Sequence, residues 1–359
     1  MSHRTNLPLK LALVFLLPWG AFDAPCHAGQ WYKGNTHAHT ELCGHADSSP
    51  QTVAQWYHDH GYNFLILSEH NKFIDPKSVK LKGRVRKDFL LVPGEEVTGH
   101  KTIHSTAMNV NRLVPWHFNH QLRSKIIQRH VDETIKAGGV TILNHPNFGW
   151  AVQARDMLPV KKLYLFELYN GHPSVHNFGD PRHPSTEQLW DDLLTQGMTI
   201  FGVGSDDAHH FADWSAKKSN PGRGWVMVQA EELTSPAVTH AMTKGDFYSS
   251  SGVMLKEIMR QPAKISIEVD EIATNKELDS PILAGRKVKE GKPGYLVEFI
   301  GPGGKVIQTN SETKASCPVN LPYLRCKVTR RVKGKDGSLR EYYAWTQPVF
   351  TDSRAKLEL

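Results

Sequence analysis

The chain has 359 residues, of which 39% are hydrophobic and 22% are charged. This length and balance are typical of a globular protein that buries one large core and carries a second, smaller domain. A formal charge of +7 and a pI near 9.1 would suit an anionic substrate or surface. No long Lys/Arg block with interleaved aromatic residues occurs, so nucleic-acid binding is not predicted.

Residues 1–28 are expected to form a signal peptide. Arg4 and Lys10 supply a positive start, and residues 11–17 form an apolar stretch that is too short to span a bilayer. Cys26 and Ala28 place small residues at positions −3 and −1 of a cleavage before Gly29. The alternative is an uncleaved anchor. We expect an exported protein, periplasmic or secreted, with no membrane span after cleavage.

Strands and helices alternate through residues 29–255. Continuous apolar runs such as 63–67 predict strands buried on both faces, and helical spacing of apolar residues, as in 52–60, predicts helices. The predicted strands cover residues 30–36, 63–67, 89–92, 102–110, 140–143, 163–168, 199–203 and 223–228. The predicted helices cover residues 52–60, 120–136, 186–196 and 235–244. This order favours parallel strands with covering helices, in an open sheet or a barrel.

Side chains that can bind metals follow these strands. Of the 20 histidines, 17 lie between His37 and His210. His37 and His39 are two residues apart, so both point to one face of an extended strand. In a barrel, the carboxyl ends of all strands meet at one mouth. The residues at those ends, which predict a polynuclear metal site, are His37, His39, His70, Glu96, His145, Asp207 and His209.

The composition changes near residue 255. Helical periodicity fades, and short alternating runs appear at 264–269, 295–300 and 324–332, separated by Gly/Pro clusters. Residues 245–252 are interpreted as a turn leading into this segment. We therefore predict a small antiparallel, sandwich-like β domain over residues 256–359.

Cleavage of the leader would leave three cysteines. In an oxidising compartment, Cys317 and Cys326 could form a disulfide. Cys43 would then have no partner, and it lies beside the histidine cluster in the sequence. We interpret it as a small buried thiol, with a role at the metal as the alternative.

Five short motifs follow one another in a defined order: His37-Ala38-His39-Thr40, Glu69-His70, Gly94-Glu95-Glu96, Asn144-His145-Pro146 and Asp207-Ala208-His209. Over roughly residues 30–255, they resemble the PHP (polymerase and histidinol phosphatase) superfamily of metal-dependent phosphoesterases. The tail, through residues 323–325 and 344–348, resembles the β appendage of exported two-domain members. The resemblance implies an α/β fold, a distorted (β/α)7 TIM-like barrel followed by a small antiparallel β domain.

The resemblance also implies two or three divalent metal ions at the mouth, which could be Zn, Mn or Fe. His37, His39 and Asp207 would bind the first ion. Glu96 would bridge the first and second ions, and His104 and His145 would complete the second. The third ion would be held by His45, His70 and His209.

At four places two candidate ligands compete. The chain departs from the family pattern at Gly44, where many members carry an aspartate, and at an additional aspartate in the last motif. We prefer His45 to Asp47, Glu96 to Glu95, His104 to His100 and Asp207 to Asp206. Asp206 is expected to support the loop or a ligand.

The predicted function is hydrolysis of a phosphate mono- or diester, with a small anionic phosphorylated substrate. Clustered cations offset the charge of such a substrate and lower the pKa of bound water. Glu69 is expected to orient an imidazole, and His209 or Asp207 to manage the proton of the leaving group. The alternatives are a metal-dependent hydrolase of a non-phosphate ester, lactone or amide, and a non-enzymatic exported protein that binds metal or carbohydrate.

Overall fold

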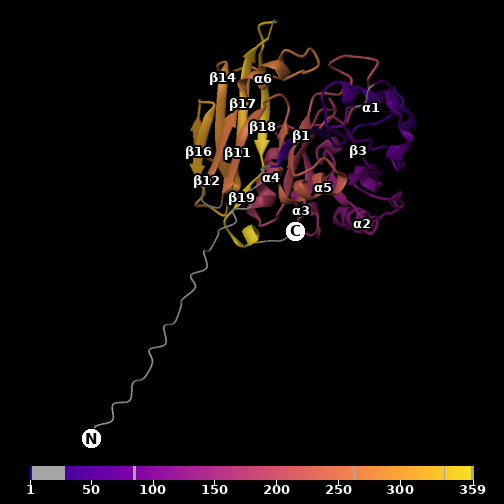
Figure 1. Ribbon diagram of the computed structural model, residues 1–359, viewed down its shortest axis with the longest axis horizontal. Helices are drawn as coiled ribbons and strands as arrows, with labels where there is room; N and C mark the ends of the chain where they lie inside the picture. Colours follow the sequence, from indigo (N-terminus) through magenta and orange to yellow (C-terminus); the bar gives the residue numbers. More distant parts are fainter. Residues whose placement is uncertain (2–28, 84–85, 262–263, 335, 357–359) are drawn as a thin grey trace.

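The computed structural model describes residues 1, 29–83, 86–261, 264–334 and 336–356. Nearly all of the predicted signal peptide lies outside these residues. Within the described part, no helix combines the length and the apolar character needed to cross a membrane. Figure 1 shows two halves side by side, an N-terminal half of strands and helices and a C-terminal half built mainly of strands.

The N-terminal half begins with three parallel strands. They are β1 (Gln30–Asn35), β2 (Phe64–Ile66) and β3 (Leu90–Val92), paired in the order β1-β2-β3. All three residues of β2 are buried, as its continuous apolar run predicts. Gly34 lets β1 pass under the Phe64 ring, because a Cβ there would lie 2.1 Å from the ring atoms. Between β1 and β2, helix α1 (Pro50–Asp59) is capped by Ser49, whose side chain accepts from the Thr52 N–H.

A second sheet has five strands in the order β4-β5-β6-β7-β8. Its strands are β4 (Gly94–Thr98), β5 (His104–Met108), β6 (Val140–Leu143), β7 (Leu165–Asn170) and β8 (Phe201–Ser205). The last three pair in parallel, but β4 with β5 and β5 with β6 are antiparallel. The expectation of uniformly parallel strands is therefore wrong here. The link 99–103 is too short for a crossover, so the chain reverses as a hairpin.

Two isolated bridges join these sheets at their polar ends. Ala38, just after β1, pairs with Ala208, just after β8, and His70, just after β2, pairs with Glu96 on β4. Both bridges are parallel. Because the bridged residues neighbour the predicted ligands, the two sheets are held together at the place where the polar strand ends meet. The strands nevertheless belong to two sheets, so the described residues show a mixed α/β fold rather than one continuously closed barrel.

Helices cover the outside of these strands (Figure 1). They are α2 (Arg123–Lys136), α3 (Ala154–Met157), α4 (Thr186–Thr195) and α5 (Ser235–Lys244). Their buried faces and the strands share one apolar core, which includes Ile126, Phe166 and Trp190. The predicted helices 186–196 and 235–244 are thus confirmed closely, whereas α2 begins later than the expected residue 120. The shared core fixes the positions of the strands, and with them the positions of the polar residues at the strand ends.

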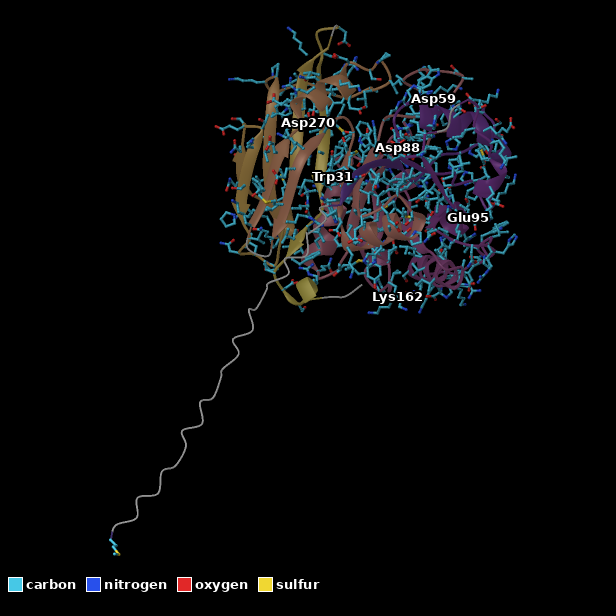
Figure 2. All side chains as sticks on the ribbon, viewed as in Figure 1. Trp31, Asp59, Asp88, Glu95, Lys162 and Asp270 are labelled. Atoms are coloured by element: carbon cyan, nitrogen blue, oxygen red, sulfur yellow. The ribbon has the colours of Figure 1, made fainter. Side chains whose placement is uncertain are left out.

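The large sheet continues into the C-terminal half. Strand β9 (Trp225–Ala230) pairs antiparallel with β1, β10 (Phe247–Ser250) with β9, and β18 (Leu339–Thr346) with β10. The expected turn at residues 245–252 therefore contains a strand. Figure 2 shows Trp31 of β1 between the two halves, and its ring lies edge-on to that of Tyr248 at 5.4 Å. Eleven strands in all belong to this sheet, so backbone pairing crosses the expected boundary near residue 255.

The tail contains the antiparallel strands that its alternating pattern predicts. The large sheet also includes β13 (Arg286–Val288), β14 (Gly294–Gly301), β15 (Lys305–Asn310), β17 (Tyr323–Lys333) and β19 (Val349–Phe350). A separate sheet contains β11 (Leu255–Gln261), β12 (Lys264–Val269) and β16 (Lys314–Pro318). Helix α6 (Glu271–Leu278), capped by Asp270, was not predicted. The thiols of Cys317 and Cys326 are buried and free, so the suggested disulfide is not formed.

Candidate metal centre

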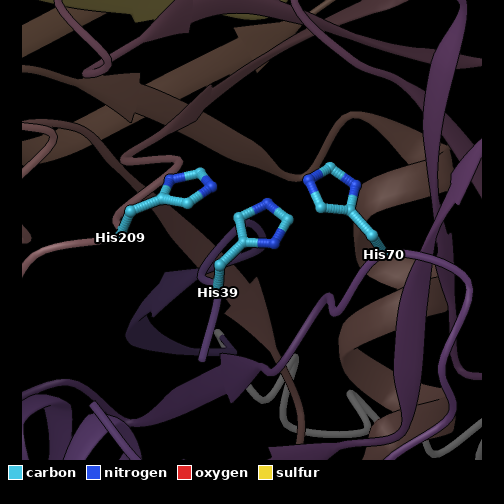
Figure 3. A group of neighbouring side chains, drawn as sticks. All are labelled: His39, His70 and His209. Atoms are coloured by element: carbon cyan, nitrogen blue, oxygen red, sulfur yellow. The ribbon is translucent and has the colours of Figure 1, made fainter. Parts of the chain in front are cut away.

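The side chains predicted as metal ligands lie together at the bridged ends of the N-terminal strands. Each comes from a strand end or the loop that follows it, except Glu96 on β4 and His104 at the start of β5. Figure 3 shows the ring of His39 between those of His70 and His209. We call this set the mouth cluster: His37, His39, His45, His70, Glu96, His104, His145, Asp207 and His209. Its residues lie between positions 37 and 209 of the sequence but come together in space.

Glu96 lies at the centre of the mouth cluster and is fully buried. Its Oε1 lies 3.3 Å from a ring nitrogen of each of three imidazoles: His37, His104 and His145. Its Oε2 faces two others, at 2.6 Å from His70 Nδ1 and 3.6 Å from His39 Nε2. One carboxylate thus lies close to imidazoles predicted for different ions, which is the arrangement that a bridging ligand requires.

Asn144 holds Glu96 in this orientation. Its Nδ2 donates to Glu96 Oε1 at 2.8 Å, and its Oδ1 accepts from the backbone N–H and the hydroxyl of Thr106. In the sequence, Asn144 is recognised only as the first residue of the motif Asn144-His145-Pro146, and its hydrogen bond to Glu96 was not predicted. Its position directly before His145 is the signal that could have suggested a supporting role.

Glu167 contacts the mouth cluster through His37, a contact that was not predicted from the sequence. It sits inside β7 with its side chain buried, and its Oε1 lies 2.7 Å from His37 Nδ1. It also accepts from the His145 backbone N–H and the Asn170 side chain, and from the Ser205 hydroxyl. Since Nδ1 of His37 is engaged, Nε2 is the nitrogen that faces the cluster. A glutamate in the middle of an apolar strand was the available signal.

His39 is held between two carboxylates. Its Nδ1 lies 3.5 Å from Glu69 Oε1, and its Nε2 lies 3.3 Å from Asp207 Oδ1. Burial alone would lower the pKa of His39, but bonds to Asp207 and Glu69 raise it to about 9. Burial would likewise raise the pKa of Glu69, but His39 and Thr40 bring it to about 2. Glu69 therefore stays ionised behind the imidazole, as the predicted orienting role requires.

Asp207 and His145 hold unusual backbone conformations. Their φ angles are +51° and +24°, in a region that residues other than glycine rarely adopt. Such strain persists where the surroundings impose it and is concentrated at functional sites. It aims Asp207 at the histidines, whereas Asp206 turns away to accept from the Tyr57 hydroxyl and the backbone N–H groups of residues 222–224.

His45 and His209 face each other at the outer edge of the mouth cluster. His45 Nδ1 lies 3.2 Å from the Cys43 carbonyl, and His209 Nδ1 lies 2.9 Å from the Asp207 carbonyl. Each Nδ1 therefore carries the hydrogen and donates. The two Nε2 atoms, which are then both acceptors, face each other at 3.1 Å. Two lone pairs at this distance repel unless a positive charge lies between them.

The competing candidates lie elsewhere. Glu95 faces the opposite side of β4, where its Oε1 accepts from the Val114 N–H, and burial raises its pKa to about 7. Asp47 is engaged by backbone N–H groups of Phe211 and the residues after it. His100 is exposed on the turn 100–102, whereas His104 faces Glu96. In each pair, the residue preferred from sequence lies in the mouth cluster.

His172 is a second residue whose place was missed. Its ring centroid lies 5.7 Å from that of His209, and its Nδ1 accepts from the Ser174 N–H at 3.1 Å. In a neutral ring the hydrogen then sits on Nε2, so this imidazole offers an N–H at the edge of the cluster. Its place in the loop after residues 163–168 favours a surface histidine from the sequence alone, with a position at the mouth as the alternative.

The donor set fits divalent cations. Among the described residues, the buried His145 Nδ1 has no hydrogen-bond partner, and His39 Nδ1, Glu96 Oε2 and His104 Nδ1 have charged neighbours but no hydrogen bond of ordinary geometry. Buried polar atoms are normally paired, so unpartnered ones call for an explanation such as an ion. Donor atoms of three groups lie within 4.8 Å of one another: His39, His70 and His209; His37, Glu96 and His145; and His37, His39 and Asp207.

A comparison with solved structures finds a two-domain protein from Bacteroides vulgatus that contains a predicted PHP-like metal-dependent phosphoesterase. The two chains share 12% sequence identity with a TM-score of 0.46, over 88% of this chain and 95% of that chain. No protein-family model and no curated protein matches the sequence. The function is therefore inferred from the side chains of the mouth cluster.

Proposed function

We propose that the protein is a metal-dependent phosphoesterase of the PHP type, which hydrolyses a phosphate mono- or diester with water at a di- or trinuclear site. The observation that carries this proposal is the position of Glu96, which lies close to imidazoles predicted for different ions. The strands that hold these residues would act as a distorted barrel closed by the bridges at Ala38 and His70.

The chain would hold the cations in three positions. His37, His39 and Asp207 would hold the first, and His104 and His145 the second, with Glu96 shared between them. His45, His70 and His209 would hold the outer position. Bound divalent cations would neutralise phosphate charge and lower the pKa of water towards neutrality. Zinc, manganese and iron all suit imidazole and carboxylate ligands.

The chain's own residues would then position the substrate and move its protons. Glu69 and Glu167 fix the rings of His39 and His37 from behind. The Nε2–H of His172 would donate to a phosphate oxygen or to the leaving group. Asp207 remains the candidate for the leaving-group proton, because Nε2 of His209 would bind the outer cation and its Nδ1 donates to the Asp207 carbonyl.

Several features favour an anionic substrate. Most cluster ligands are imidazoles, which add no negative charge. Two divalent cations would balance the four buried carboxylates of Glu69, Glu96, Glu167 and Asp207, and three would outweigh them. The whole chain is also basic, with a formal charge of +7. A small phosphorylated molecule reaching an exported enzyme is the substrate class that fits these charges.

A substrate panel tests this proposal. The mature chain, loaded with Mn²⁺ or Zn²⁺, is assayed with phosphomonoesters, phosphodiesters and carboxylic esters. His104→Ala is compared with His100→Ala, because both replace a histidine of the same hairpin but only His104 faces Glu96. We expect phosphoester hydrolysis that His104→Ala reduces strongly and His100→Ala does not. Hydrolysis of carboxylic esters alone, or equal activity of the two variants, would contradict the proposal.

A further inference from the structure

We propose that the thiol of Cys43 is a ligand at the outer cation position, which makes this position a mixed sulfur–nitrogen site for zinc or a similar thiophilic divalent ion. This inference rests on the proposed function, because it assigns the donors and the metal class of one of its cation positions. It corrects the interpretation of Cys43 as only a small buried thiol.

The local fold brings Cys43 to this position. Thr40 caps the turn Glu41–Cys43 by accepting from the Leu42 N–H, and Gly44 ends it with a φ of +82°. Only glycine adopts this conformation without cost. The chain therefore turns sharply after Cys43 and returns His45 to the same side. Cys43 and His45 are presented as a pair by one short turn.

The distances allow both residues to bind one ion together with His209. Donor atoms of Cys43, His45 and His209 lie within 4.8 Å of one another. In a tetrahedral site, bonds of about 2.3 Å to sulfur and about 2.0 Å to nitrogen place sulfur and nitrogen roughly 3.5 Å apart. Small side-chain rotations would bring the three donors to these separations. Together with His70, which is assigned to the same position above, these residues would make a tetrahedral set of four protein ligands.

An independent observation points to an ion at this place. The Nε2 atoms of His45 and His209 face each other at 3.1 Å while both Nδ1 atoms donate to carbonyl groups. The pair therefore presents two lone pairs that need a positive charge between them, whatever the role of the thiol. Cys43 is partly exposed and free, so its sulfur is available to complete the set.

The donor set predicts a preference among metals. Thiolates favour zinc and other soft or borderline ions, whereas manganese and magnesium prefer oxygen ligands. The inner positions, which combine imidazoles with Glu96 and Asp207, lack this bias. The outer position should therefore discriminate against manganese more strongly than the inner ones do.

Spectroscopy on the metal-loaded full-length mature chain tests the assignment. Zinc X-ray absorption should detect a sulfur neighbour at about 2.3 Å, and Co²⁺ loading should give a sulfur-to-cobalt charge-transfer band in the near ultraviolet. Cys43→Ala should abolish both signals and weaken the preference for zinc over manganese. Cys317→Ala, which removes a buried thiol on β16, is the matched control and should leave both signals unchanged. Circular dichroism confirms that each variant is folded.

Two results would overturn the assignment. Zinc or cobalt bound by nitrogen and oxygen alone in the unmodified chain would exclude a cysteine ligand, while leaving the proposed function intact. Sulfur signals that persist in Cys43→Ala would assign them to another thiol. A chain that binds no metal at all would instead contradict the proposed function itself, so the two failures are distinguishable.

Discussion

Two clusters of charged and titratable residues, each partly or fully buried over most of its members, differ in how their charges are balanced. The seam cluster, formed by Glu187, Asp191, Arg325 and Lys327 between α4 and β17, contains equal numbers of cations and anions. Arg325 donates to both oxygens of Asp191, at 2.8 and 2.7 Å, and Lys327 lies 2.5 Å from Glu187. Its charges are balanced within the protein.

The mouth cluster lacks such balance. Ring nitrogens that accept hydrogen bonds face one another, as in the 3.1 Å approach of His45 and His209, and buried atoms have no partner in the described part of the chain. Burial and charge alone thus do not identify a functional site. What distinguishes the mouth from the seam is the close approach of two acceptor nitrogens, since Arg325 Nη1 of the seam also lacks a hydrogen-bond partner among the described residues.

The largest effect is expected when the centre of the mouth is broken. Glu96→Gln keeps the shape of the side chain but removes the charge that both groups of imidazoles face. We expect activity to fall to background and at least one cation to be lost, because the bridging carboxylate is shared by two positions. Glu95→Gln, on the opposite face of β4, is the control. Full activity in Glu96→Gln would contradict the central role of this residue.

Breaking the seam should affect stability instead. Arg325→Met leaves Asp191 buried without its partner, which costs about 3–5 kcal/mol of unfolding free energy. Urea denaturation measures this loss, and metal affinity should not change under native conditions. Replacing both partners, with Arg325→Met and Asp191→Leu, should recover much of the stability. A loss of metal binding in the folded Arg325→Met variant would contradict the claim that the seam cluster contributes to stability and not to metal binding.

Glu167→Gln sharpens the comparison, because this carboxylate contacts His37 of the mouth cluster but is not itself a predicted ligand. Removal of a group that orients a metal-bound histidine typically lowers metal affinity or activity by about 10–100-fold. Competition with a fluorescent chelator would measure the affinity. The exposed Glu232→Gln variant should bind metal as the unmodified chain does. An affinity of Glu167→Gln equal to that of the unmodified chain would show that His37 needs no such support.

The smallest expected effect is a change in how the unfolding free energy depends on pH when Glu187 of the seam cluster is replaced. Burial would raise the pKa of Glu187, but Lys327 and Arg325 hold it below its ordinary value of 4.5. Because the folded pKa is depressed, this contribution to stability is present above pH 4.5 and is lost as the pH falls through the folded pKa. Unfolding free energies measured on both sides of pH 4.5 should therefore decline less steeply on acidification for Glu187→Gln. Parallel curves for the two proteins would refute this account.

The convergence of the mouth cluster could be predicted because strand ends are local features of a sequence. His37, His70 and Asp207 each follow an apolar run, and the alternation of strands and helices brings such ends to one place. Their role as ligands stays a prediction. Supporting residues were harder to find: Glu167 lies inside an apolar strand, and the sequence cannot show which face of that strand meets a histidine.

The fold was predicted in part for a similar reason. Element types depend on local periodicity, so helix 235–244 was placed correctly. Strand direction depends on the length of the link between two strands. The link 99–103 is too short for a parallel crossover, and the antiparallel hairpin of β4 and β5 was therefore not predicted by the helix–strand alternation. The strand Phe247–Ser250 owes its structure to β9 and β18 on either side, and no local pattern reports such distant partners.

The most direct test of the account counts the cations. Elemental analysis of the purified chain, normalised to protein concentration, should give two or three divalent ions per chain. The same analysis of folded Glu96→Gln should give at least one fewer. An unmodified chain that carries no metal and takes up none on dialysis against Zn²⁺ or Mn²⁺ would contradict the claim that the mouth cluster is a metal centre.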